Sequence, residues 1–222
     1  MKTLGLVTIS QSPRPDLLED ILPIIGKDVR LLQAGALDGL TREEIASFAP
    51  DNEVDILETP LKDGTTAVIA TRHILSLLQD CVSSLEGQGA DVILFLCTGE
   101  FPRYKANCPI IYPSSAISSI VPLISGEDSL IVMCPNRGQI EMMKAKWEPF
   151  FRTVKVIPAS PFGDAKELDP AISRIRELDG KLVVMDCFGF TPSMQKRVEQ
   201  ETGKLAICSR TLAARIASEL LT

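Results

Sequence analysis

The sequence predicts an α/β protein built from two pseudo-symmetric lobes, each a mainly parallel sheet flanked by helices. Short apolar runs rich in Val, Ile and Leu alternate with amphipathic stretches along the chain, as in repeated strand–helix units. The 222 residues suffice for two lobes of about 100 residues each, and 45% of them are hydrophobic, enough for a substantial core. Two segments in different halves of the chain also begin in the same way.

These two segments suggest an internal repeat. "LGLVTISQSPRPDLL" gives a strand, a polar loop with Arg14 and a helix, and "SLIVMCPNRGQIEMM" repeats the order with Asn136 and Arg137 in the loop. Two prolines flank a short strand in "NCPIIYPSS", the best candidate boundary. We therefore expect a first lobe over residues 1–112, completed by the C-terminal helix 209–222, and a second lobe over 113–208.

The individual elements follow from these patterns. In chain order, the apolar runs predict strands at Leu4–Thr8, Val29–Gln33, Val54–Thr59, Ala67–Ala70, Val92–Leu96, Ile110–Tyr112, Leu130–Met133, Val154–Ile157, Leu182–Met185 and Leu205–Ile207. Helical spacing predicts helices at Pro15–Ile25, Arg72–Leu85, Arg137–Phe151, Lys166–Leu178, Pro192–Glu201 and Thr211–Leu221. Lys62-Asp63-Gly64 between two strand-like runs predicts an antiparallel hairpin.

Composition excludes several classes of protein. A net charge of −6 argues against a nucleic-acid surface, which needs clustered basic residues. No apolar run approaches the roughly 20 residues of a membrane-spanning helix. The six cysteines form no CxxC or Cys/His cluster, so no metal site is expected. The N-terminus lacks the pattern of a signal peptide, so we expect a cytoplasmic protein with reduced thiols.

Two strands end on a cysteine. "VILFLCTGEF" runs apolar into Cys97, and "LVVMDCFGFT" runs apolar into Cys187. Ligands of parallel α/β sheets bind beyond the carboxyl ends of the strands, so a site is predicted in the cleft between the lobes. A helix N-terminus or a nearby cation favours the thiolate. Two thiols on opposite sides of one carbon could remove a proton from one face and return it to the other.

Small polar residues and cations lie in the neighbouring loops. Their hydroxyl, guanidinium and backbone N–H groups suit a carboxylate or enolate oxygen, so we expect a small anionic carboxylate ligand. The candidate ligand-binding residues are Ser10, Ser12, Arg14, Thr98, Gly99, Asn136, Arg137, Gly189 and Thr191. Glu100 and Asp186 adjoin the two cysteines, and helix capping is favoured for both over a role as general acid or base. Trp147 is interpreted as packing between helix and sheet.

The paired strand-terminal cysteines resemble the aspartate/glutamate racemase superfamily, which includes hydantoin racemases, maleate isomerases and arylmalonate decarboxylases. This resemblance implies two facing cysteines as acid and base, no pyridoxal phosphate, metal or other cofactor, and a homodimer. "GLVTISQSPRPD", "LTREEIASFAP", the Cys97 segment and "MDCFGF" more closely resemble the AroM family, from residue 4 to the C-terminal "LAARIASELL". That family resemblance implies a fold more firmly than a reaction.

The sequence departs from the racemase pattern after both cysteines. The racemases follow their first cysteine with Asn-Thr and their second with Thr-His, whereas Thr98-Gly99 and Phe188-Gly189 stand here. Aspartate and glutamate are therefore not carried over as substrates. The expected function is a racemase or isomerase that transfers a proton next to a carboxylate or carbonyl. The alternatives are a one-cysteine decarboxylase and a non-catalytic binding or regulatory protein on the same fold.

Overall fold

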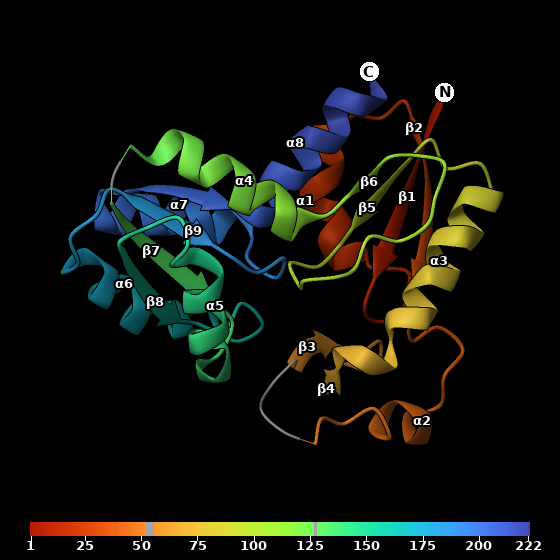
Figure 1. Cartoon of the computed structure of the whole chain (residues 1–222), viewed down its shortest axis with the longest axis horizontal. Coiled ribbons are helices and arrows are strands. Elements are labelled where there is room, and N and C mark those ends of the chain that lie inside the picture. Colours follow the sequence, from red (N-terminus) through yellow and green to blue (C-terminus); the bar gives the residue numbers. More distant parts are fainter. Residues whose placement is uncertain (52–55, 127) are drawn as a thin grey trace. The chain divides into compact units, whose positions relative to one another are not determined.

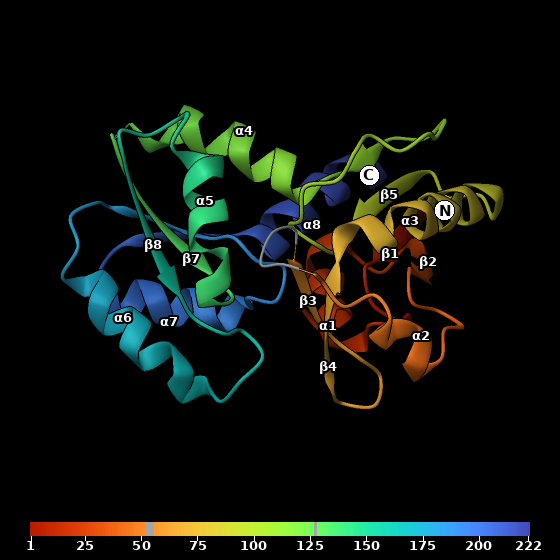
Figure 2. The ribbon, with the colours of Figure 1, turned by 60° about the horizontal axis from the view of Figure 1, so that its bottom comes forward.

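The computed structural model describes residues 1–51, 56–126 and 128–222 (Figures 1 and 2). This part of the chain divides into two compact units, Met1–Tyr112 with Ala213–Thr222 and Pro113–Leu212. Each unit contains a four-stranded sheet whose paired strands are all parallel. The predicted α/β fold with two parallel sheets flanked by helices is confirmed.

The sheet of the first unit is built around its first strand. β1 (Lys2–Thr8) lies between β2 (Val29–Gly35) and β5 (Val92–Phe95), and β6 (Ile110–Ile111) pairs with β5. Helices α1 (Pro15–Ile25) and α3 (Leu75–Gly87) cover its two faces (Figure 1). The buried side chains of α3 pack with those of β1 and β5 in one apolar cluster. The central strands β1 and β5 are buried on both faces, which explains their continuous apolar runs.

A small hairpin is added to this unit. β3 (Ile56–Pro60) and β4 (Thr66–Ala70) pair antiparallel, which confirms the turn predicted at Lys62-Asp63-Gly64. Gly64 has a φ of 82°, a left-handed conformation that glycine adopts readily. The first residues of the expected strand Val54–Thr59, Val54 and Asp55, lie outside the described residues. A short helix, α2 (Arg42–Ala46), precedes the hairpin and is capped by Thr41.

The second unit has four parallel strands between two layers of helices. The strands are β7 (Ser129–Cys134), β8 (Thr153–Pro158), β9 (Leu182–Met185) and β10 (Leu205–Cys208), in the order β10-β9-β7-β8. Its helices are α4 (Pro113–Ser125), α5 (Ile140–Trp147), α6 (Asp169–Arg176), α7 (Pro192–Thr202) and the start of α8 (Ser209–Leu221). Helix α5 lies on one side of the sheet, and α6 and α7 lie on the other (Figure 2).

The two sheets have the same topology. When only the strands of each four-stranded sheet are counted along the chain, the first strand lies between the second and the third, and the fourth pairs with the third. The backbone hydrogen bonds repeat as well: Leu96 N–H donates to the Val7 carbonyl, and Asp186 N–H donates to the Met133 carbonyl. These equivalences support an internal repeat, and they put Cys97 and Cys187 at matching places in their units.

The structure differs from the predicted helices in two respects. The helices expected from Arg72, Arg137 and Lys166 each begin as a 3₁₀ turn before the α-helix proper. Helices α2 and α4 were not predicted. In α4, the serines and Pro122 interrupt the apolar pattern of "PSSAISSIVPLIS". Ile117 and Val121, one turn apart in α4, are nevertheless fully buried. Within the described ranges, no helix is long and apolar enough to cross a membrane.

Candidate active site

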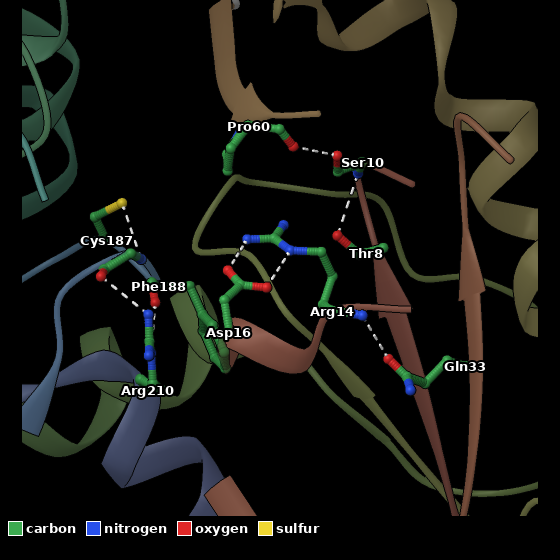
Figure 3. Close-up of polar contacts among 10 residues, drawn as sticks. Thr8, Ser10, Arg14, Asp16, Gln33, Pro60, Cys187, Phe188 and Arg210 are labelled. Atoms are coloured by element: carbon green, nitrogen blue, oxygen red, sulfur yellow. Dashed lines mark hydrogen bonds and ion pairs between the residues drawn. The ribbon is translucent and has the colours of Figure 1, made fainter. Parts of the chain in front are cut away.

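Cys97 and Cys187 have the same local geometry. Each is separated by one residue from the end of its strand, β5 or β9, and each side chain is only partly buried. The Cys97 sulfur accepts the Gly99 N–H and the Cys187 sulfur accepts the Gly189 N–H, both with an N···S distance of 3.3 Å. Figure 3 shows this contact at Cys187. A backbone donor aimed at sulfur favours the thiolate over the thiol.

Close packing disfavours a side chain at both donor glycines. A Cβ on Gly189 would lie 2.6 Å from Pro161 Cγ and 2.8 Å from the Phe162 ring. A Cβ on Gly99 would lie 2.9 Å from the Phe101 ring. Neither backbone has a positive φ, so the space around the residue, rather than the conformation, favours glycine. The sequence analysis selected both residues for their N–H groups, and these N–H groups point at the thiols.

The other thiols differ in burial. Of the six cysteines, Cys81, Cys134 and Cys208 are buried, and Cys97, Cys108 and Cys187 are partly buried. Burial raises the pKa of Cys81 to about 12 and that of Cys134 to about 11. Burial also raises the pKa of Cys108 above its usual range. The thiols of Cys81, Cys108 and Cys134 therefore stay protonated near neutral pH, so they are poor candidates for acid–base chemistry.

The predicted residues after β1 lie at the same sheet edge as Cys97, because β1 and β5 are parallel neighbours. Their polar groups, however, bond within the protein. The buried Ser10 donates its hydroxyl to the Pro60 carbonyl at 2.6 Å, which ties the hairpin to the end of β1 (Figure 3). Ser12 donates its N–H and hydroxyl to Asp38, with N···O and O···O distances of 2.7 and 2.5 Å. Both serines thereby hold the loop.

Arg14 also has an internal partner. Its guanidinium makes a two-pronged contact with the Asp16 carboxylate, at 2.9 Å from Nε and 2.6 Å from Nη2 (Figure 3). The Arg14 N–H donates to Gln33 at 2.9 Å, and the residue is 8% exposed. Asp16 therefore occupies the carboxylate position expected for a ligand. A pocket of about 500 Å³ adjoins this pair, lined by Gln11, Pro13, Arg14, Pro15, Asp16, Pro60, Leu61 and Lys62.

In the second unit, the predicted residues follow β7 and β9, which are parallel neighbours as well. Thr191 caps α7 by accepting the Met194 N–H at 3.2 Å, and its hydroxyl pairs with that of Ser193 at 2.7 Å. Asn136 is half-buried, and Arg137 is exposed at the start of a 3₁₀ turn. In the first unit, Thr98 is buried directly after Cys97.

The capping interpretation of the two acidic neighbours is wrong. The Asp186 carboxylate is fully buried and accepts hydrogen bonds from Lys146 Nζ at 2.8 Å and Trp147 Nε1 at 2.9 Å. Glu100 is exposed, and no helix follows it before Pro113. Trp147 packs as expected, but it also supplies a polar contact to the strand that carries Cys187. Lys146 gave no signal in the sequence, because it lies 40 residues away from Asp186.

Arg210 is the second residue that sequence reasoning missed. It lies in the first turn of α8 and is 3% exposed. Its Nε donates to the Phe188 carbonyl at 2.8 Å, and its Nη2 donates to the Gly189 carbonyl at 2.9 Å (Figure 3). These contacts, with the bond from the Ser209 hydroxyl to the Met185 carbonyl, explain why the first turn of α8 groups with the second unit.

Among the residues that the structure describes, no three His, Cys, Asp or Glu side chains gather in a way that could hold a metal ion. The sequence analysis considered only the spacing of Cys and His along the chain, whereas this observation concerns side chains that lie close in space.

Solved structures share the fold. The chain is similar to aspartate racemase of Picrophilus torridus (14% identity, TM-score 0.63), over 99% of this chain and 94% of that one. It is similar to unliganded arylmalonate decarboxylase (14%, 0.63), over 100% and 93% of the two chains. A third similar structure is maleate isomerase of Pseudomonas putida S16 (15%, 0.57), over 96% and 90%. At such identities the likeness establishes the fold alone.

Sequence comparison establishes the family. Comparison with curated proteins finds no significant match. The family model described as "AroM protein" matches residues 4–221, nearly the entire chain, in agreement with the resemblance carried by its motifs. The chain belongs to the AroM protein family.

Proposed function

We propose that this protein is an enzyme that transfers a proton at a carbon next to a carboxylate or carbonyl of a small molecule, as a racemase or isomerase does. Cys97 and Cys187 would act as the acid–base pair on opposite faces of that carbon. The observation that carries the proposal is the matched pair of partly buried thiols, each at an equivalent strand end and each accepting a glycine N–H at 3.3 Å. The fold shared with a racemase, an isomerase and a decarboxylase supports this class of reaction.

The reaction requires one thiolate and one thiol. The thiolate removes the proton, forming its S–H bond as the C–H bond breaks, and the electron pair moves onto the carbonyl oxygen to give an enolate. The opposite thiol then donates its proton to the other face of the carbon and becomes a thiolate. The Gly99 N–H would stabilise the Cys97 thiolate and the Gly189 N–H would stabilise the Cys187 thiolate, so the same kind of hydrogen bond serves both half-reactions.

The pocket beside Arg14 is the proposed place for the carboxylate of the ligand. Its lining residues include Arg14 and Lys62, two cationic residues that suit an anion. The ligand carboxylate would have to share or replace Asp16 on the guanidinium. Aspartate and glutamate are not favoured as substrates, because Phe188 and Gly189 follow Cys187.

The test is exchange of substrate hydrogen with solvent. The wild-type protein is incubated in D₂O with a panel of small carboxylates, and loss of the proton signal next to the carboxylate is followed by NMR. We expect exchange with at least one compound, slowed by about 10² to 10⁴ in both Cys97→Ser and Cys187→Ser. Cys108→Ser, a partly buried loop thiol, is the matched control and should leave exchange unchanged. The active compound should also protect both Cys97 and Cys187 from alkylation.

A non-catalytic binding protein is the second candidate, and a specific observation favours it. The hydroxyls of Ser10, Ser12 and Thr191 and the guanidinium of Arg14 all have partners within the protein. Saturable binding of a carboxylate without exchange, unaffected by either cysteine substitution, would establish this function instead. Release of CO₂ that depends on only one cysteine would identify a one-thiol decarboxylase.

A further inference from the structure

We propose that the pocket beside Arg14 binds an acid with an apolar ring and a single negative charge, and that Lys62 determines the specificity for that charge. All residues that line the pocket belong to the first unit. The inference rests on the proposed function only in taking this pocket as the place of the ligand. It adds the chemical class of the ligand, a monocarboxylate with an apolar body rather than a small polar dicarboxylate.

Most of the pocket wall is apolar. Pro13 and Pro15 come from the segment between β1 and α1, and Pro60 and Leu61 come from the hairpin. The first two are exposed and the other two are half-buried, so their apolar surface is accessible to a ligand. Proline has no N–H, so three of these positions offer contact surface but no backbone donor. An apolar group of a ligand would therefore gain free energy by burial here.

The size of the pocket favours a ring. A cavity of about 150 Å³ accommodates benzene. The volume of about 500 Å³ therefore has room for a ring together with its carboxylate. A two-carbon acid would leave most of the apolar wall in contact with water. Rigid proline rings also suit a rigid partner, because neither side loses rotamer freedom on contact.

The two sides of the pocket are tied together by hydrogen bonds. The Ser10 hydroxyl donates to the Pro60 carbonyl at 2.6 Å, and the Lys62 N–H donates to Gln11 Oε1 at 3.1 Å. Both bonds join the hairpin to the loop after β1, and they lie on either side of Leu61 in the sequence. The wall is therefore formed without a ligand, which reduces the cost of ordering on binding.

The charges of the lining match one carboxylate. Two cations, Arg14 and Lys62, and one carboxylate, that of Asp16, line the pocket, so its lining has one net positive charge. Arg14 already donates from Nε and Nη2 to Asp16 (Figure 3). Within the described part of the chain, the Lys62 ammonium has no ion-pair partner, and the adjacent Asp63 pairs with Arg42 at 3.0 Å. Lys62 is therefore the cation that is open to a ligand, and a second ligand carboxylate would lack a matching charge.

The experiment compares four probes that vary the ring and the second charge separately: acetate, succinate, phenylacetate and phenylsuccinate. Binding to the full-length wild-type protein is measured near neutral pH and at low salt by NMR titration. We expect saturable binding of phenylacetate, at least about 10-fold tighter than that of acetate, because the ring buries apolar surface. Each dicarboxylate should bind no more tightly than the corresponding monocarboxylate.

Variants assign the two effects to residues. Lys62→Gln should weaken phenylacetate binding about 10-fold, and Lys62→Arg, which keeps the charge, should retain it. Leu61→Ala should weaken phenylacetate binding about 5-fold and leave acetate unchanged. Lys2→Gln is the control for charge, because Lys2 is exposed at the start of β1, at the opposite edge of the sheet. Val68→Ala is the control for the wall, because Val68 is 47% exposed on the same hairpin. Neither control should change binding of any probe.

The wild-type panel tests the inference without any variant. Equal affinities for acetate and phenylacetate would overturn the apolar subsite, and tighter binding of either dicarboxylate would overturn the single charge. An unchanged phenylacetate affinity in Lys62→Gln would overturn the role of Lys62.

The readout is binding, so its failure is distinguishable from failure of the proposed function. Phenylacetate that binds in the expected pattern while no carboxylate exchanges hydrogen would leave the inference standing and remove the proposed catalysis. Hydrogen exchange of succinate without any binding of phenylacetate would overturn the inference and leave the proposed catalysis standing.

Discussion

The turn after Cys97 and the turn after Cys187 make the same contact between sulfur and a glycine N–H but are held by different forces. Around Cys187 the supports are polar and buried: the pair of Asp186 with Lys146, the Trp147 indole and the Arg210 guanidinium. The chain then turns at once into α7. After Cys97, by contrast, no helix begins before Pro113.

The Cys97 side is organised by aromatic stacking instead. The ring of Phe95, at the end of β5, lies 5.6 Å from that of Phe101, 5.4 Å from that of Tyr104 and 5.2 Å from that of Tyr112. Offset aromatic pairs of this kind contribute about 0.5–1.5 kcal/mol each beyond the area they bury. A repeated backbone geometry can therefore be supported by apolar packing in one half and by electrostatics in the other. The first support is apolar and shapes the loop, whereas the second consists of buried charged groups.

Breaking the buried pair should have the largest effect on stability. Lys146→Met leaves the Asp186 carboxylate buried without its cation, so the free energy of unfolding should fall by about 3–5 kcal/mol. Lys146→Met with Asp186→Asn should regain most of this loss, because the amide is neutral and can still accept the Trp147 N–H. Urea denaturation near neutral pH measures both. A loss below about 1 kcal/mol for the single variant would show that the pair is not a main support of the Cys187 side.

Filling the space at the two donor glycines should have an intermediate effect. Gly189→Ala pushes a Cβ against the Pro161 ring, which cannot rotate away, and should cost about 1–3 kcal/mol. Gly99→Ala meets the ends of the Phe101 and Leu57 side chains, which can move, and should cost less. Gly87→Ala at the end of α3 is the control, since nothing lies within 4 Å of the added Cβ. Equal losses at Gly99 and Gly189 in urea denaturation would contradict the proposed difference in packing.

The pH dependence of stability should show the smallest effect. The pKa of Cys134 is about 11 in the folded protein, above its unfolded value near 9.0. The folded state therefore keeps a proton that the unfolded state loses, so stability is full below about pH 9 and falls as the pH rises through this window. Cys134→Ser keeps a donor for the Asn136 carbonyl but does not titrate there. From about pH 9 to 11 the wild type should lose up to about 1.4 kcal/mol per pH unit more than this variant in urea denaturation. Parallel curves would contradict the raised pKa of Cys134.

Much of the fold was readable from local patterns. Continuous Val/Ile/Leu runs predicted the strands, because a strand covered on both faces needs no polar alternation. The hairpin followed from Lys62-Asp63-Gly64, because a turn has a local chemistry that three residues express. Helix α4 was missed, because its burial comes from neighbours that the local pattern does not contain. The two cysteines were found because each follows the end of its strand by two positions.

The partners of the predicted site residues could not be read in the same way. Ser12 pairs with Asp38, Asp186 with Lys146 and the Cys187 turn with Arg210, contacts that join residues from 21 to 40 positions apart. Spacing along the chain carries no information about which side chains meet across a sheet edge. Arg14 illustrates the limit: its cation was evident in "SPRPD", but its pairing with Asp16 depends on the conformation of the first helical turn.

The sequence by itself determined the α/β class, the strand-terminal position of both thiols and membership of the AroM family, because each of these is expressed in contiguous residues. Only the tertiary structure decided which polar groups are already paired, and that a buried guanidinium is bonded to the Cys187 turn. The physical reason is that hydrogen bonds and charges act over a few ångströms in space. Folding sets those distances by packing elements that are remote in the chain.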